Sequence, residues 1–186
     1  MRILVTGTDG YIGSILGSEL IGDGHDVIGL DTGFYRSGWM YCDQSAIDRI
    51  PETLNADLRR VGKRLFEGID AVVHMAELSN DPLGENNPAI TNEINHLGSV
   101  NLAETAKKAG IERFVYTSSC SVYGVSDADF VDETSATNPQ TAYARCKALV
   151  ERDVGKMVSG DFSPVFLRNA TAYGAWRRMR VDMGLK

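Results

Sequence analysis

The chain has 186 residues, a formal charge of −6 and 43% hydrophobic residues. This length and composition are typical of a folded domain with its own core, and no low-complexity tract indicates disorder. The negative charge disfavours a nucleic-acid surface, although backbone amides at a helix N-terminus can still bind phosphate.

The number of cysteines and the hydropathy of the chain indicate its cellular compartment and its class of partner. Cys42, Cys120 and Cys146 are odd in number and far apart, which fits neither a disulfide framework nor a zinc site. The apolar run 3–5 is too short for a signal peptide, and no stretch approaches the roughly 18 apolar residues of a membrane span. We therefore expect a cytoplasmic protein with no metal, nucleic-acid or membrane partner.

Short apolar runs bounded by turn residues alternate with longer amphipathic stretches. The runs predict strands at 3–6, 26–31, 53–57, 70–76, 113–118 and 164–168. The amphipathic stretches predict helices at 11–21, 88–108 and 138–158, the last opened by Asn138 as N-cap and Pro139. This alternation favours an α/β fold, a Rossmann-type doubly wound parallel sheet of about six strands with helices on both faces. Ligands bind such sheets at the carboxyl ends of the strands.

A glycine-rich loop, TGTDGYIG, joins the first strand to the first helix. Gly7, Gly10 and Gly13 have the spacing G-x-x-G-x-x-G, which permits a tight turn, close approach of a pyrophosphate and packing of the helix on the strand. The N–H groups at the helix start, from Tyr11 and Ile12 onward, would hold the phosphates. An ordinary strand–helix turn is the alternative. The phosphate-binding reading is favoured because the glycine triplet follows the first strand, precedes a helix and lies at the start of the chain.

Asp31 ends the second strand, where this fold places the acid that binds the ribose hydroxyls. A carboxylate there favours NAD and repels the 2′-phosphate of NADP. A common strand-end turn aspartate is the alternative. The irregular stretch 32–43 follows and would border the adenosine half of a bound dinucleotide.

Further motifs follow in a fixed order. They are Asp57-Leu58, His74-Met75-Ala76, Asn95-His96-Leu97-Gly98, SSCSVYG at 118–124, YARCK at 143–147 and RNATAYG at 168–174. Together with the glycine triplet, this set resembles the extended short-chain dehydrogenase/reductase family, particularly its nucleotide-sugar epimerase/dehydratase branch. The resemblance covers essentially the whole chain, and the ordered set is far more specific than any one motif.

The resemblance implies a cofactor role for each matching position. Asp57 and Leu58 would border the adenine, Met75 and Ala76 would pass under the middle of the cofactor, and Asn95 would pin the long helix near the site. Asn169 and Tyr173 would face the nicotinamide end. The alternatives are that Leu58, Met75 and Ala76 are core residues and that Asn95 only bonds backbone.

The resemblance also implies a catalytic set of Ser119, Tyr143 and Lys147. Tyr143 and Lys147 are four residues apart and therefore share one helix face. A tyrosine with a reference pKa near 10 is a poor base, but a nearby ammonium and the positive nicotinamide would stabilise its phenolate. Tyr143 would take a hydroxyl proton, Lys147 would also hold the nicotinamide ribose, and Ser119 would orient the reacting oxygen. A plain amphipathic helix with a snorkelling lysine is the alternative.

Other reactive side chains fit the site less well. Tyr123 and Tyr173 have no lysine four residues later, and Cys146 lacks the nearby histidine that a nucleophile needs. The three histidines show no metal-ligand spacing and are expected to be structural.

The predicted reaction is epimerisation by reversible hydride transfer to tightly bound NAD. The related sugar dehydratases carry an Asp–Glu pair directly after the serine or threonine, where this chain has Cys120 and Ser121. Reductases of the branch usually use NADPH, which Asp31 disfavours. The substrate implied by the resemblance is a nucleotide sugar.

Members of the family continue into a C-terminal substrate domain, whereas this sequence stops at Lys186. We therefore expect 1–186 to be the NAD-binding Rossmann domain, with the substrate domain largely absent. The alternative function is a truncated or regulatory NAD-binding module with little turnover. A homodimer through the two long helices is a further expectation, although their alanines, Ala103, Ala106 and Ala109, equally suit packing on the sheet. The arginines at 177, 178 and 180 are interpreted as a tail cluster rather than a phosphate contact.

Overall fold

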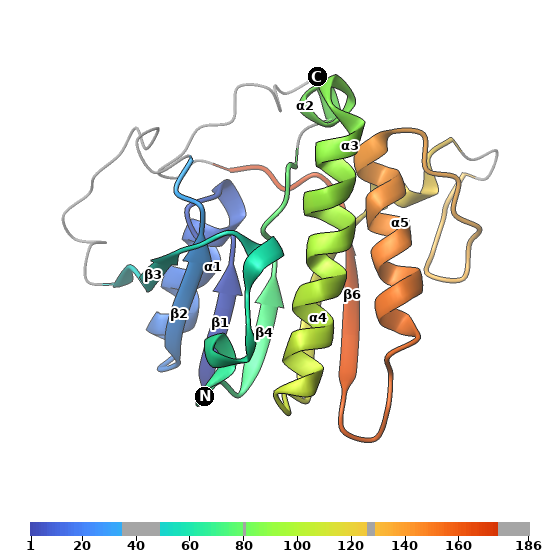
Figure 1. Cartoon of the computed structure of the whole chain (residues 1–186). Helices are drawn as coiled ribbons and strands as arrows, with labels where there is room; N and C mark the ends of the chain where they lie inside the picture. The colour runs from blue at the N-terminus through green and yellow to red at the C-terminus, as the bar shows by residue number, and fades with distance from the viewer. Residues whose placement is uncertain (35–48, 80, 126–128, 175–186) are drawn as a thin grey trace.

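The computed structural model describes residues 1–34, 49–79, 81–125 and 129–174. Within these ranges, six strands form a parallel sheet in the order β3-β2-β1-β4-β5-β6 (Figure 1). The strands are β1 (Arg2–Thr6), β2 (Asp26–Asp31), β3 (Glu52–Asn55), β4 (Ala71–His74), β5 (Arg113–Ser119) and β6 (Ser163–Asn169). The strand order reverses between β1 and β4, so the ligand crevice of this fold lies beyond their carboxyl ends. The predicted fold class is confirmed.

Helices cover both faces of the sheet, because successive strand residues point to opposite sides. α4 (Ser99–Lys108) and α5 (Ala142–Gly155) lie on one face, over a core that includes Leu4, Val72 and Phe114 (Figure 1). On the other face, Leu20 and Ile21 of α1 (Tyr11–Gly22) pack against a smaller cluster of Ile3, Val5 and Val27.

The predicted helix at 88–108 is present but is not a uniform α-helix. It consists of α3 (Pro88–Thr91), a π-helical segment η5 (Asn92–Gly98) and α4, which follow one another without a break. Such π segments are rare and often occur at functional sites. Gly98 fits here because a Cβ would come within 2.3 Å of Cδ1 of Leu58. The packing of η3 (Leu58–Arg60) on this helix therefore depends on a glycine.

The prediction that Asn138 and Pro139 open the last helix is wrong. α5 begins at Ala142, and the side chain of Thr141 caps it by accepting a hydrogen bond from the Ala144 amide. Asn138 is instead bound to the turn after β5, where its amide donates to the Val122 carbonyl at 2.9 Å. The helix also ends at Gly155 rather than near 158.

Several short helices were not predicted from the sequence. They are α2 (Asp81–Asn86), η3, η4 (Lys63–Phe66) and η6 (Cys120–Tyr123). No helix in the described ranges is long and apolar enough to cross a bilayer.

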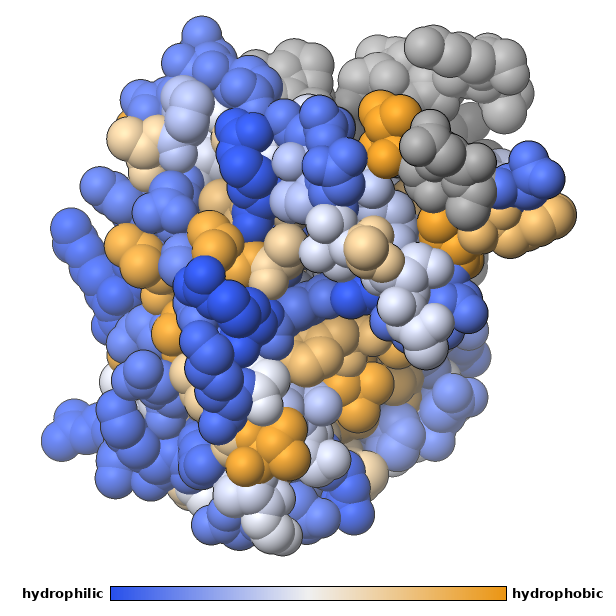
Figure 2. All heavy atoms as spheres, turned by 90° about the vertical axis from the view of Figure 1, so that its right-hand side faces the viewer, coloured by the Kyte–Doolittle hydropathy of each residue, from blue (hydrophilic) through white to orange (hydrophobic). Residues whose placement is uncertain are grey.

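The outer strand β6 leaves apolar surface exposed. Phe166 and Arg168 point toward α5, so Val165 and Leu167 point to the opposite side, where they remain 47% and 43% exposed. Figure 2, which views the molecule from the β6 side, shows apolar surface at the centre of this face among hydrophilic side chains.

A chain of buried polar side chains joins β1, β4 and the long helix. Thr6 Oγ1 lies 2.7 Å from His74 Nδ1, His74 Nε2 lies 2.7 Å from Ser99 Oγ, and Ser99 Oγ donates to the Asn95 carbonyl. Because the Ser99 hydroxyl donates its proton to the Asn95 carbonyl, it must accept the hydrogen bond from His74 Nε2–H. The other ring nitrogen, Nδ1, then accepts a hydrogen bond from the Thr6 hydroxyl. His74 is thereby held neutral. Burial, reinforced by the charge of Lys147, lowers its pKa to about 3.

Acid should destabilise the fold through His74. The unfolded imidazole gains a proton below its ordinary pKa of 6.5, whereas the folded one does so only near pH 3. The unfolded state binds more protons in this interval, so the free energy of unfolding falls as the pH drops, by about 1.4 kcal/mol per unit. Urea unfolding at pH 7 and pH 5 should therefore show a loss of about 2 kcal/mol from this group.

The control is His74→Gln, which removes the titrating group and should flatten this part of the pH dependence. His25→Gln, at a position near the N-terminal amine, should keep it. An equal slope in native protein and His74→Gln would contradict the assignment.

Candidate active site

The glycine-rich loop is shaped by contacts that exclude side chains. Gly7 has φ +79°, and its amide donates to the Leu30 carbonyl at 2.8 Å. A Cβ on Gly7 would come within 3.0 Å of the Ala76 amide nitrogen, and one on Gly13 within 2.0 Å of the Gly7 carbonyl oxygen. The loop therefore brings bare backbone to the carboxyl ends of β1 and β4. This arrangement fits the close approach of a pyrophosphate.

The start of α1 presents backbone donors beside this loop. Gly10 is the N-cap, makes no side-chain cap, and accepts from the Ser14 amide at 3.0 Å. The amides that begin an α-helix have no intrahelical partner, which suits an anion. Ile12 is 42% exposed, whereas Tyr11 is buried and its hydroxyl donates to the Gly174 carbonyl at 2.6 Å. The segment after β6 thus crosses the carboxyl edge of the sheet to reach α1.

Asp31 lies at the carboxyl end of β2, next to the glycine-rich loop. Its Oδ2 accepts from the Asp9 amide at 3.1 Å and its Oδ1 from the Gly33 amide at 2.8 Å. The carboxylate therefore holds the loop and the following turn together. The adjoining stretch that was expected to border the adenosine falls largely within 35–48, outside the described residues.

The segment after β4 is held in place by side chains from two sides. The amides of Met75 and Ala76 both donate to Thr6 Oγ1 at 3.0 Å. Asn95 makes paired bonds with the backbone of Leu78, accepting at 2.8 Å and donating at 2.9 Å. Asn95 thus pins the π-helical segment to this part of the crevice.

Asp57 and Leu58 have clear structural roles. The Asp57 carboxylate caps η3 and pairs with the Arg59 guanidinium, with 2.6 Å between Oδ2 and Nη2. The hydrogen bonds from Arg59 lower the pKa of Asp57. Leu58 is 6% exposed and belongs to the core. Both lie between β3 and the long helix.

Tyr143 and Lys147 lie on α5 and face the end of β5. The Lys147 ammonium donates to the Thr117 carbonyl, two residues before Ser119. The Lys147 Nζ atom is 5.4 Å from the centroid of the Tyr143 ring. The lysine side chain is only 3% exposed. It is therefore an internal ammonium beside the tyrosine rather than a snorkelling surface lysine.

Ser119 ends β5 and pairs in register with Asn169, which ends β6. The Ser119 hydroxyl caps η6 by accepting from the Ser121 amide at 3.1 Å. Its neighbour Ser118 points toward α5 and donates to Glu151. Tyr173, beyond β6, is 82% exposed. The structure thus places Ser119, Asn169, Tyr143 and Lys147 at one edge.

Other candidate groups do not form a second centre. Burial raises the pKa of the Cys146 thiol to about 11, which makes it a poor nucleophile. No group of three or more His, Cys, Asp or Glu side chains in the described part of the chain is arranged to hold a metal ion. The arginines at 177, 178 and 180 and Cys42 lie outside the described residues.

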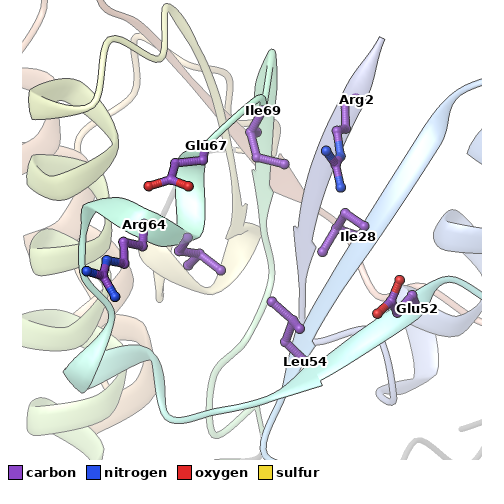
Figure 3. Close-up of a pocket in the computed structure, with 8 residues that line it drawn as sticks. Arg2, Ile28, Glu52, Leu54, Arg64, Glu67 and Ile69 are labelled. Atoms are coloured by element: carbon purple, nitrogen blue, oxygen red, sulfur yellow. The ribbon is translucent and has the colours of Figure 1, made fainter.

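A shallow hollow lies away from this edge (Figure 3). Its charged lining residues are Arg2, Glu52, Arg64 and Glu67, around apolar side chains that include Ile28 and Leu54. Arg2 and Glu52 begin their strands, so the hollow belongs to the amino-terminal end of the sheet. It is on the wrong side for the ligand of a doubly wound fold.

Glu77 has a buried side chain that the sequence interpretation missed. It follows β4 and pairs with Lys147 at 2.8 Å, with only 1% of its side chain exposed. No motif spacing points to it, because its partners come from β5 and α5. The sequence does contain one signal for Glu77, which is a carboxylate directly after an apolar strand and Met75-Ala76.

A glycine-rich loop at the switch point of a doubly wound sheet defines a dinucleotide-binding protein of the Rossmann class. The sequence profile of the NAD dependent epimerase/dehydratase family matches residues 3–184, and the chain belongs to this family. The predicted family is thereby confirmed, as is NAD as the cofactor of that family.

Individual relatives agree with this placement. UDP-glucose 4-epimerase from Mycolicibacterium smegmatis is 34% identical over 157 residues, which cover 81% of this chain and 49% of that protein. UDP-glucose 4-epimerase from Stenotrophomonas maltophila, solved with NAD and formylated UDP-arabinopyranose, is 31% identical with a TM-score of 0.78, covering 90% and 52%. MoeE5, solved with UDP-glucuronic acid and NAD, is 29% identical with a TM-score of 0.82, covering 98% and 58%. The chain thus spans about half the length of these relatives.

Proposed function

We propose that the chain binds NAD and carries the hydride-transfer site of an epimerase that acts on a sugar hydroxyl of a nucleotide sugar. The observation that carries this proposal is the internal Lys147 ammonium, held between the Thr117 carbonyl and the Tyr143 ring at the carboxyl edge of the sheet. The same edge holds the glycine-rich loop, so a cofactor site and a base lie together. The relatives solved with NAD and a UDP-sugar support the ligand classes.

The residues of this edge divide the work of binding. The backbone of Gly7, Gly10 and Gly13 and the first amides of α1 hold the pyrophosphate, and Asp31 holds the ribose hydroxyls. Met75 and Ala76 support the middle of the cofactor. Asn169 and Tyr173 border the nicotinamide end.

The residues of α5 and β5 handle the substrate hydroxyl. Ser119 orients the reacting oxygen, and Tyr143 takes its proton while the adjacent carbon loses a hydride. Lys147 stabilises the phenolate and holds the nicotinamide ribose. NAD, when bound, would supply a hydride acceptor that can also give the hydride back.

Epimerisation fits these residues better than elimination or reduction. Elimination of water needs an acid–base pair, and the two positions after Ser119 hold Cys120 and Ser121. Reduction with NADPH would place a 2′-phosphate against the Asp31 carboxylate. Reversible hydride transfer needs only the groups already present.

An NAD-binding module without turnover is the second candidate. It is favoured by the glycine-rich loop and Asp31, which shape a cofactor site without any substrate-binding group. The deciding experiment measures NAD bound to the purified 186-residue protein and product formation from UDP-, GDP- and dTDP-sugars. Product with any sugar supports the epimerase, whereas stoichiometric NAD with no product supports the module. Absence of NAD binding would contradict both.

Replacing Asp31 should change cofactor preference. We expect Asp31→Ala to weaken NAD binding about tenfold and NADP binding much less, because the carboxylate both binds the ribose hydroxyls and repels the 2′-phosphate. Asp31 also holds the Asp9 and Gly33 amides, so a loosened loop would weaken both cofactors equally. The ratio of the two dissociation constants, from calorimetric titration, separates these effects. An unchanged ratio would remove the ribose role.

Dimerisation through the two long helices stays a prediction. Ala103 and Ala106 are fully buried in the chain's own core, so they are not available to a partner. Ile90 and Leu97, on the same long helix, are 43% and 53% exposed. They are the apolar groups that a partner helix would cover.

A further inference from the structure

Glu77 is a buried carboxylate that the proposed mechanism leaves without a role. It lies three residues after the end of β4, in the segment that Thr6 and Asn95 hold against the crevice. An isolated carboxylate is very costly to bury, so such a group is retained with a partner. Its partners therefore indicate what it does.

Both oxygens of Glu77 lie beside a polar group. Oε2 lies 2.8 Å from Lys147 Nζ, and Oε1 accepts a hydrogen bond from the Tyr116 hydroxyl at 2.5 Å. The side chains of Glu77 and Lys147 are 1% and 3% exposed, and Tyr116 is fully buried. An ammonium beside Oε2 and a hydroxyl that donates to Oε1 both favour the ionised form of the carboxylate.

The same contacts fix the position of the Lys147 ammonium. It lies against Glu77, donates to the Thr117 carbonyl and sits 4.5 Å from the centroid of the Tyr116 ring. The Thr117 carbonyl accepts one of the three N–H donors of the ammonium, and the Glu77 carboxylate attracts its charge. Glu77 thus helps to set where the ammonium lies.

Charge gives Glu77 a second effect. Oxidised NAD has a cationic nicotinamide ring, whereas the ring of NADH is neutral. An unpaired ammonium in a dry site would repel the cationic ring, because like charges interact strongly at low dielectric. Glu77 offsets that charge within 2.8 Å of the Lys147 nitrogen.

We propose that Glu77 is a positioning residue that holds Lys147 in place and offsets its charge, so that the site accepts oxidised NAD. The proposal rests on the proposed function, because it takes Lys147 as the group beside the nicotinamide. Burial raises the pKa of the Glu77 carboxyl, and the charge of Lys147 and the bond from Tyr116 oppose the rise. Each charge of the Glu77–Lys147 pair therefore stabilises the other, because removing either one leaves its partner charge buried and unpaired.

A double-mutant cycle in stability tests the pairing without any cofactor. Glu77→Gln keeps the shape and removes the charge, and Lys147→Met removes the ammonium. We expect Glu77→Gln to raise the unfolding equilibrium constant at least about 100-fold in the native background and less than about tenfold in the Lys147→Met background. If Glu77→Gln folds only together with Lys147→Met, the pairing is also supported. Equal effects in both backgrounds would overturn it.

Dissociation constants for NAD and NADH test the role toward the cofactor. Glu77→Gln should weaken NAD at least about tenfold and NADH no more than about threefold. A purely structural role would weaken both equally, and tighter NAD binding would mean that Glu77 competes for Lys147; either result overturns the proposal. Tyr116→Phe removes only the hydroxyl that orients Glu77 and should shift the ratio in the same direction by about twofold to fivefold. This variant decides the question if Glu77→Gln does not fold alone.

The outcomes of these experiments distinguish a failure of this inference from a failure of the proposed function. If native protein binds neither NAD nor NADH, the proposed function and the cofactor part of this inference are both overturned. The stability cycle still decides whether Glu77 and Lys147 form a coupled pair.

Discussion

Tyr143→Phe should reduce turnover by about 10²- to 10⁴-fold while leaving NAD affinity within about twofold of the native value. The substitution removes only the phenolic oxygen, which is the proposed proton acceptor. The ring remains, 5.4 Å from Lys147 Nζ in the native structure, so the packing between α5 and the end of β5 is kept. Loss of rate without loss of cofactor binding is the mark of a group that acts in the transition state. Product chromatography with an active nucleotide sugar and calorimetric titration with NAD measure the two quantities.

The matched control is Tyr123→Phe. Tyr123 lies in η6 near the same edge, and its hydroxyl accepts from Arg168 Nη1 at 3.0 Å. It has no lysine four residues later, so its loss should change the rate by less than about threefold. Native turnover in Tyr143→Phe, or equal losses in the two variants, would show that Tyr143 is not the base.

Gly13→Ala should destabilise the protein and remove most of its affinity for NAD. The new Cβ would lie 2.0 Å from the Gly7 carbonyl oxygen and 2.9 Å from Thr8 Cα, and both are backbone atoms that cannot rotate away. α1 must shift from the loop, at a cost of about 1–3 kcal/mol in the free energy of unfolding. The loop and the first helical amides then no longer face one phosphate, so NAD binding should fall at least about tenfold. Urea unfolding and calorimetric titration measure the two effects.

Gly62→Ala is the control for the loss of a glycine as such. Gly62 has φ −121°, and a Cβ there meets nothing within 4 Å. Stability should change by less than about 0.5 kcal/mol, with NAD affinity unchanged. If Gly13→Ala binds NAD like native protein, the pyrophosphate does not sit on this loop.

The local pattern of apolar and turn residues was sufficient to predict most of the sheet. Runs between turn residues located the six described strands to within two residues or so. The signal was clearest for β1 and β4, because a buried parallel strand is apolar on both faces. β4 ends at His74, earlier than the apolar run suggested, because the Met75 and Ala76 amides bond to Thr6 Oγ1 instead of a neighbouring strand. Such a diversion depends on a distant side chain and has no local signature.

Helix starts were harder to predict where two capping signals compete. Asn138-Pro139 and Thr141 are both acceptable openings, and only the tertiary contact of Asn138 with the turn at Val122 decides between them. The site shows the same division. The glycine spacing and the Tyr143–Lys147 pair are sequence-local, whereas Glu77 gains its partners from β5 and α5, which only the folded chain brings together.

The π-helical segment has a consequence for insertions and deletions. A single-residue deletion in the middle of a packed α-helix normally rotates everything after it by about 100° and moves buried side chains into solvent. η5 already holds the wider i→i+5 turn, which amounts to one residue more than an α-helix would use over the same length. Removing one residue from Asn92–Gly98 would therefore regularise the helix and leave α4 in register on the sheet. The deletion would, however, displace Asn95 and break its paired hydrogen bonds to the Leu78 backbone. We therefore expect such a variant to fold, but with a less firmly held crevice.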